Sequence, residues 1–116
     1  MRKLTFDEFK AELSAQGVTR EHFAVKCVQC GTVQSRQDFV DAGAAPTIEE
    51  AQRWWGFSCI GRFKGGVGCD WTLGGLFRIH TLEIDPSDGG EPFPCFEPAS
   101  PEEAQAHADS KEREVA

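Results

Sequence analysis

The chain has 116 residues and a formal net charge of −7 at pH 7, a length that predicts one small domain. No apolar run approaches the length of a membrane-spanning helix, so we expect no membrane association. Residues 1–80 hold ten Lys and Arg against nine Asp and Glu, whereas residues 81–116 hold two against ten, and this distribution lacks the basic footprint of most nucleic-acid-binding proteins.

The first predicted element is an amphipathic helix over residues 6–16. Thr5 and Glu8 have the spacing of a capping box, in which two side chains satisfy free amides of the first helical turn. Gly17 is a natural helix terminator. Apolar side chains recur on one face of this helix: Phe6, Phe9 and Leu13. Residues 1–19 are therefore predicted to form an N-terminal helical segment.

A metal-binding turn is predicted at the tip of the β-hairpin that follows. Residues 23–26 and 32–34 have strand-like composition. Between them, Cys27 and Cys30 have the C-x2-C spacing of zinc sites. Gly31 suits the tight turn, because glycine tolerates positive φ.

Two short helices are predicted after the hairpin. Ser35 and Thr47 have the composition of N-caps, and Asp38 and Glu50 lie three residues after them, as in capping boxes. The second helix is expected to end at Gly56. The two predicted helices cover residues 36–42 and 48–55.

A second, wider cysteine pair follows these helices. Cys59 and Cys69 are separated by nine residues, four of which are glycine, so we expect a loop whose two ends meet at the metal. Residues 57–60 are predicted as a strand that enters the site. Residues 71–73 and 76–84 are predicted as a hairpin, because two glycines between them mark a turn.

Together the two pairs predict one tetrahedral Zn2+ site with four thiolate ligands. Its predicted ligands are Cys27, Cys30, Cys59 and Cys69. Four thiolates around the ion leave a negative site, which nearby cations would offset. The cationic residues nearest in sequence are Lys26, Arg36, Arg62 and Lys64.

Other uses of the cysteines are weaker readings of the same pattern. A redox C-x2-C pair normally opens a helix after a strand, whereas strand-like residues flank this pair on both sides. Disulfides would require export, and the N-terminus does not resemble a signal peptide, so we expect a cytosolic protein. Cys95 is expected to be a free or packed thiol. Cys95 and His80 are the alternative ligands to a member of the second pair.

The C-terminal residues 86–116 are predicted as an acidic, proline-containing extended segment and tail. Residues 102–116 have no convincing apolar face, so a frayed helix and disorder are both open for them, and the order of residues 97–116 is undecided. The predicted fold class is α+β, with small zinc-ribbon-like hairpins around the cysteines and two or three short helices. The zinc-binding domain is expected over residues 20–85.

No catalytic residue is predicted. The loop over residues 61–68 contains cations and glycines but lacks the spacing of a phosphate-binding motif. Deaminases that use paired cysteines also need an H-x-E element, which is absent from the sequence. Four thiolates would leave a zinc ion no open position for catalysis, so a small metalloenzyme is only an alternative.

The chain resembles a group of small zinc-ribbon-like proteins encoded by bacteriophages and prophages. The resemblance covers about residues 20–85 and rests on three stretches: the run over residues 27–31, the Trp54-Trp55-Gly56 segment and the run over residues 68–76. It implies a viral protein that acts in the bacterial cytosol. It implies no settled activity and transfers no catalytic residue, and the wide spacing of the second cysteine pair departs from an ordinary zinc ribbon.

The predicted function is a zinc-stabilised protein-interaction module that contacts a host protein. A small viral chain with an acidic segment is suited to inhibit a host defence nuclease complex, of the CRISPR or restriction type, because it can compete for a positively charged channel. The alternative is single-stranded nucleic-acid binding through exposed aromatic residues and local cations. The candidate interaction residues are Trp54, Trp55, Arg62, Phe63 and Lys64.

Overall fold

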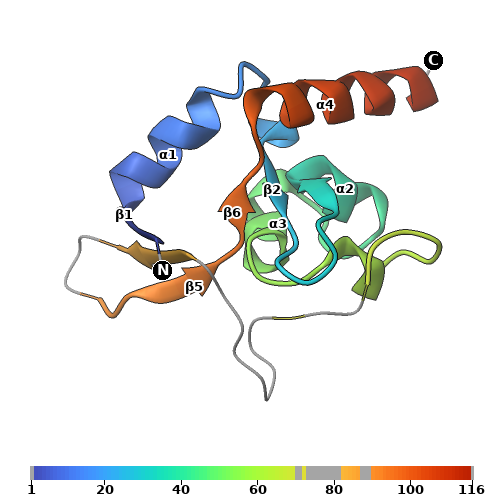
Figure 1. Cartoon of the computed structure of the whole chain (residues 1–116). Coiled ribbons are helices and arrows are strands. Elements are labelled where there is room, and N and C mark those ends of the chain that lie inside the picture. The colour runs from blue at the N-terminus through green and yellow to red at the C-terminus, as the bar shows by residue number, and fades with distance from the viewer. Residues whose placement is uncertain (1, 70–71, 73–81, 87–89, 116) are drawn as a thin grey trace.

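The computed structural model describes residues 2–69, 72, 82–86 and 90–115. Within this part, four α-helices and two three-stranded sheets form the regular structure, so the predicted α+β class is confirmed. Figure 1 shows the two sheets next to each other, with α1 on one side and α4 lying across one end of the molecule. None of the helices in these residues is long and apolar enough to cross a membrane.

The first sheet joins the N-terminal strand to two strands from the last third of the chain. Its strands lie in the order β1 (Arg2–Thr5), β4 (Leu82–Asp85) and β5 (Phe93–Cys95), with β1 parallel to β4 and β4 antiparallel to β5. Leu82 and Ile84 are fully buried and alternate with the half-buried Glu83 and the exposed Asp85, as expected for a strand with one face on the core. β1 is not among the predicted elements, because its pairing partner lies far away in the sequence.

The second sheet contains the predicted hairpin. β2 (Ala24–Lys26) lies between β3 (Val33–Ser35) and β6 (Glu97–Pro98) and is antiparallel to both. The predicted hairpin is therefore confirmed, with the first cysteine pair at its tip. β6 comes from the acidic C-terminal segment, and Pro98 fits the edge of a sheet because proline has no amide to donate.

Three helices begin at the predicted capping residues. Thr5, Ser35 and Thr47 each accept a hydrogen bond from an amide of the first helical turn. Glu8 and Asp38 reach back to complete two of the capping boxes, with hydrogen bonds of 2.9 and 2.8 Å. The helices are α1 (Phe6–Ser14), α2 (Arg36–Asp41) and α3 (Ile48–Trp55), and a short 3-10 turn, η1 (Arg20–His22), precedes β2.

The chain ends in a fourth helix, α4 (Pro101–Val115), which is one of the two alternatives expected for the tail. The expectation that this segment lacks an apolar face is wrong. Ala104 and Ala108, one turn apart, are buried, and Ala104 packs with Ala24 and Ala99. Small side chains let the helix lie close to the second sheet, so a polar composition conceals a buried face.

The prediction of a strand over residues 57–60 is wrong. Only Ser58 forms a bridge, with Thr72, and the chain then turns into the 3-10 segment η2 (Ile60–Arg62). The backbone amide of Ile60 donates to the side chain of Gln34 at 2.8 Å instead of to a neighbouring strand. Most of the hairpin predicted after Cys69 lies outside the described residues; its last residues belong to β4.

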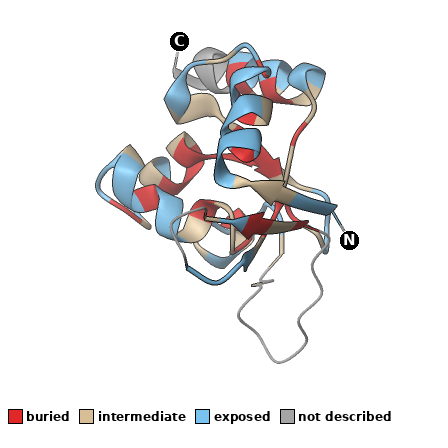
Figure 2. Ribbon diagram, turned by 90° about the vertical axis from the view of Figure 1, so that its left-hand side faces the viewer, coloured by how far each residue is buried: buried red, intermediate tan, exposed pale blue. Residues whose placement is uncertain are grey.

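The core lies between the two sheets and the first three helices. Figure 2 shows the buried residues gathered along the strands and the inner sides of the helices. Phe9 and Leu13 of the predicted apolar face of α1 are buried, and so are Phe39 of α2 and Trp55 of α3. Two of the metal-site cysteines, Cys27 and Cys59, belong to the same cluster. The metal site is therefore part of the core, and its geometry depends on the packing of the whole domain.

Candidate metal centre

The structure brings the four predicted cysteines together. All four Sγ atoms, from Cys27, Cys30, Cys59 and Cys69, lie within 4.8 Å of one another. The Sγ atoms of Cys27 and Cys69 are 3.7 Å apart, and those of Cys30 and Cys59 are 3.8 Å apart. Four sulfurs at about 2.3 Å from a tetrahedral zinc ion lie about 3.8 Å apart, whereas a disulfide would require about 2.0 Å. The spacing fits a bound metal and not a disulfide.

The first cysteine pair is held by the turn that joins β2 to β3. The amide of Gly31 donates to the carbonyl of Cys27 at 2.9 Å, and the amide of Cys27 donates to the carbonyl of Thr32 at 3.0 Å. Gly31 has a φ of 77°, in the left-handed region that favours glycine. This closed turn places the sulfurs of Cys27 and Cys30 on one side of the backbone.

The second cysteine pair is held by a loop that closes on itself, as the sequence predicts. The amide of Cys69 donates to the sulfur of Cys59 at 3.2 Å, so the two ends of the loop meet directly. A side chain at Gly61 would lie 2.3 Å from the carbonyl oxygen of Cys69, and one at Gly68 would lie 2.7 Å from the sulfur of Cys59. Glycine at both positions lets the two backbone segments approach each other.

The four thiols have unequal surroundings. Cys27 and Cys59 are buried, Cys69 is half-buried and Cys30 is exposed. Burial raises the pKa of the Cys27 thiol, although amide hydrogen bonds from Cys30 and Gln29 oppose the rise. Burial also acts to raise the pKa of Cys30, but hydrogen bonds from Thr32 and the neighbouring thiols outweigh it and lower this pKa to about 7. The site therefore has one thiol that opens toward solvent and ionises readily.

A buried glutamine joins the two halves of the site, although no motif in the sequence marks it. The side chain of Gln34 in β3 donates to the carbonyls of Trp55 and Ser58 at 2.7 and 2.9 Å and accepts from the amide of Ile60 at 2.8 Å. Gln34 thus fixes the chain on both sides of Cys59. Its only signal in the sequence is a polar residue in a strand beside the first pair.

Two of the four cations expected to offset the thiolates, Lys26 and Arg36, have other partners. Lys26 forms an ion pair of 3.0 Å with Glu103 of α4, and the Arg36 guanidinium stacks 4.5 Å from the centroid of the Trp55 ring. Arg62 and Lys64 are exposed. The hydrogen bonds given to the sulfurs by described residues come from backbone amides, and Thr32 Oγ1 lies 3.0 Å from the sulfur of Cys30.

The two alternative ligands are not part of the cluster that the structure describes. Cys95 is buried in β5, where burial raises the pKa of its thiol to about 12, and it matches the expected packed thiol. His80 lies outside the described residues. The structure describes all five cysteines as free thiols.

The candidate interaction residues divide into buried and exposed groups. Trp55 is only 4% exposed, so it is a core residue and not a surface for base stacking. Trp54 and Phe63 are half-buried, with ring centroids 5.5 Å apart. Arg62 and Lys64 remain on the surface. The two adjacent tryptophans therefore differ: Trp55 belongs to the core and Trp54 is half-buried.

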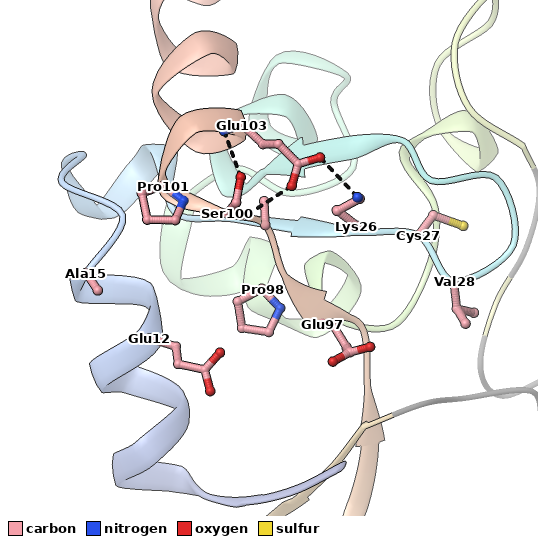
Figure 3. A pocket seen from close by; sticks show the side chains of 11 residues that line it. Glu12, Ala15, Lys26, Cys27, Val28, Glu97, Pro98, Ser100, Pro101 and Glu103 are labelled. Atoms are coloured by element: carbon pink, nitrogen blue, oxygen red, sulfur yellow. Dashed lines mark hydrogen bonds and ion pairs between the residues drawn. The ribbon is translucent and has the colours of Figure 1, made fainter. Parts of the chain in front are cut away.

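A groove of about 610 Å3 lies beside the metal site, between α1, β6 and the start of α4. Figure 3 shows Glu103 between Ser100 and Lys26, with Cys27 at one end of the groove. Three of the lining side chains are acidic, and one is the cation Lys26. Lys26 is paired with Glu103, and Arg2 bridges the other two acids, Glu12 and Glu97, at 3.1 and 2.7 Å. The charges that line this groove therefore already have partners within the protein.

Comparison with known proteins gives one result. A family model described as VVA0879-like matches residues 5–99, which include all four metal-site cysteines and both sheets except the first residues of β1. No curated protein matches the chain, and no solved structure matches it.

Proposed function

The chain belongs to the VVA0879-like family, and we propose that in this member the four cysteines hold a structural Zn2+ ion within a small protein-interaction module. The observation that carries the proposal is the sulfur spacing of 3.7 and 3.8 Å within a four-thiol cluster. Four thiolates fill the four positions of a tetrahedral ion, and closed sites of this kind serve stability. Function is then expected on the surface and not at the metal.

Elemental analysis of freshly purified, reduced protein tests the metal assignment. One equivalent of zinc is expected, and Cys59→Ser should lose it because Cys59 is fully buried among the other thiols. Cys95→Ser is the matched control, since this buried cysteine lies outside the cluster and should leave zinc content unchanged. Protein without stoichiometric metal, or equal loss in both variants, would contradict the proposal.

We further propose that the module acts on a host complex that handles nucleic acid, as a phage-encoded inhibitor would. The negative charge of the C-terminal segment supports this proposal. Residues 81–116 hold ten acidic side chains, and Glu102 and Asp109 of α4 are exposed. α4 is packed against the body through alanines, so its acids are presented on a rigid element. A fixed acidic face can dock on a protein surface that normally binds phosphates.

The acidic face is tested by neutralising charges, because deleting residues 97–116 would also remove β6. The double variant Glu102→Gln with Asp109→Asn should bind its partner more weakly and with a shallower salt dependence than the unchanged protein. The control is Glu49→Gln with Glu50→Gln, which removes two exposed acids from α3 instead. Affinity purification from bacterial cells at two salt concentrations measures how much partner each double variant recovers. Equal recovery with both double variants would exclude α4 as the interface.

A further inference from the structure

A second hollow, of about 680 Å3, opens on the side of the molecule formed by α1, α3 and β5. Its volume is within the range of small-molecule sites. Its floor is the packed core, where Phe9 and Trp55 stand with ring centroids 6.1 Å apart. None of the four clustered cysteines and no residue of α4 lines this hollow.

The walls of the hollow are aromatic. Five of the nine phenylalanines line it, and so does Trp55, so its surface suits a flat apolar group. Phe6 and Phe93 stand at its rim and are 41% and 40% exposed, which makes them two of the three most exposed large apolar residues in the described chain. Exposed aromatic rings that gather at one concave site are typical of ligand recognition.

The charged side chains that line the hollow are positive, whereas the net charge of the protein is negative. Four cations line it, and none of the described residues that line it is acidic, although the chain carries a net charge of −7. The four are Lys10, Arg20, Arg36 and Arg53. Lys10 has an exposed partner in Asp7 at 3.8 Å, and Glu49 is the acidic group that acts on Arg36 from outside the lining.

Arg36 is the residue that points most directly to a ligand. It is only 8% exposed, and its Nε atom has no hydrogen-bond partner among the described residues. Its guanidinium stacks 4.5 Å from the centroid of Trp55 and 5.6 Å from that of Phe23. Burial lowers the pKa of this guanidinium, and repulsion from Arg20 lowers it further, while Glu49 partly opposes both. A buried cation beside a second cation is costly unless an anion joins them.

From this combination we infer that the hollow binds a small organic anion, with a flat apolar body against Phe6 and Phe93 and a carboxylate or phosphate head at Arg36 and Arg20. Guanidinium groups bind planar oxyanions through paired N–H donors, which the free Nε atom of Arg36 makes possible. The groove beside Cys27 offers no comparable site, because its cation already has a carboxylate partner.

Calorimetric titration of the zinc-loaded, full-length protein tests the inference with phenylbutyrate, phenyl phosphate, inorganic phosphate and the neutral analogue phenylbutanol. At least one of the two aromatic anions should bind about tenfold more tightly than phenylbutanol and than inorganic phosphate, because body and head both contribute. The stronger of the two identifies the head group. Equal affinity for anion and alcohol, or no binding of either aromatic anion up to about 10 mM, would overturn the inference.

Two variants separate binding from folding. Arg20→Gln removes an exposed rim cation, so it should weaken binding of the aromatic anion about fivefold while leaving the thermal midpoint of the free protein unchanged or higher, because repulsion on Arg36 is relieved. Lys64→Gln, an exposed cation outside the hollow, should bind normally. In a ligand titration followed by NMR, the indole N–H of Trp55 should shift, and an unchanged Trp55 signal on binding would place the ligand elsewhere and overturn the inference.

Discussion

Gly61 shows how one missing side chain determines the second half of the metal site. Its Cα lies so close to the returning loop that a Cβ atom would meet the carbonyl oxygens of Cys69 and Val67 at 2.3 and 2.6 Å. Both neighbours are backbone atoms, so they cannot rotate away as a side chain would. The approach that brings Cys69 to Cys59 is therefore possible only with glycine at this position.

Gly61→Ala is expected to weaken zinc binding at least about tenfold, because the loop must open to admit the methyl group. Gly65→Ala in the same loop is the matched control: a Cβ atom there meets nothing within 4 Å, and zinc affinity should not change. Competition with a chromogenic chelator measures both variants. Equal affinity in the two would show that the loop does not need the close approach at Gly61.

Two fully buried glutamines, Gln16 and Gln34, hydrogen-bond to backbone groups in two separate parts of the fold. Gln16 accepts from the amide of Ala24 at 3.0 Å and donates to the carbonyls of Ala24 and Ala99 at 2.8 and 3.0 Å. Gln34 makes the corresponding three bonds around Cys59. Each side chain replaces a missing strand neighbour, because it satisfies backbone groups where the chain is irregular.

Gln34→Leu should destabilise the protein by about 3 kcal/mol, because it leaves an amide and two carbonyls buried without partners. It should also speed zinc loss to a chelator, since those groups lie on both sides of Cys59. Urea unfolding of the zinc-bound protein measures the first effect. Gln37→Leu, which removes a more exposed side chain bonded only to Asp41, should cost less than about 0.5 kcal/mol.

At the scale of elements, α4 is attached to the second sheet by its first turn. Ser100 and Glu103 form a reciprocal capping box with hydrogen bonds of 3.1 and 3.0 Å, and Glu103 also pairs with Lys26 of β2. The hydrogen bond from the Ser100 amide, followed by that from Lys26, lowers the pKa of Glu103 below its ordinary value of 4.5. The start of α4 is thus joined to the strand that leads into Cys27.

A lowered pKa in the folded state means that Glu103 stabilises the attachment above pH 4.5 and that this contribution is lost as the pH falls below that value. The protection of amides in the first turn of α4, which is their exchange rate relative to the intrinsic rate at the same pH, should therefore fall between about pH 5 and pH 3. Glu103→Gln should abolish this loss of protection, whereas Glu102→Gln should retain it. An identical pH profile in unchanged and Glu103→Gln protein would assign the effect to other carboxylates.

At the scale of the whole molecule, cysteines of the candidate metal site are packed into the hydrophobic core. Cys27 and Cys59 belong to the same buried cluster as Leu82 and Ile84 of the first sheet. The four cysteines also come from two separate turns, after β2 and after α3, and Gln34 joins these turns through its hydrogen bonds. A small domain with a modest core depends strongly on such a link.

Chelation of the metal should therefore unfold the domain as a unit. We expect the thermal midpoint to fall by at least about 15 °C, and near-ultraviolet circular dichroism from the tryptophans to fall with it. Amide exchange should increase in β4 as well as in β2 and β3, because the two sheets share a core. A metal-free protein that keeps slow exchange in β4 would show that the first sheet folds independently of the site.

The sequence by itself determined the local elements and the chemistry of the metal site. Capping residues at Thr5, Ser35 and Thr47 predict three of the helices, because a capping hydrogen bond joins residues only three positions apart. The C-x2-C spacing likewise places the first pair on a hairpin turn. Spacing pointed to four of the five cysteines as ligands, but it left Cys95 and His80 open as substitutes in the second pair.

Only the tertiary structure decided how distant segments combine. The parallel pairing of β1 with β4, the position of β6 beside β2 and the burial of Ala104 depend on contacts between residues far apart in the chain. The sequence of a short polar strand does not indicate which distant strand it pairs with. Alanine is also common both on the surface and in the core, so its burial cannot be predicted from its identity. The aromatic, cationic hollow around Arg36 also depends on such contacts. Its walls come from helices and a strand that lie far apart in the sequence, so only the folded structure brings them together.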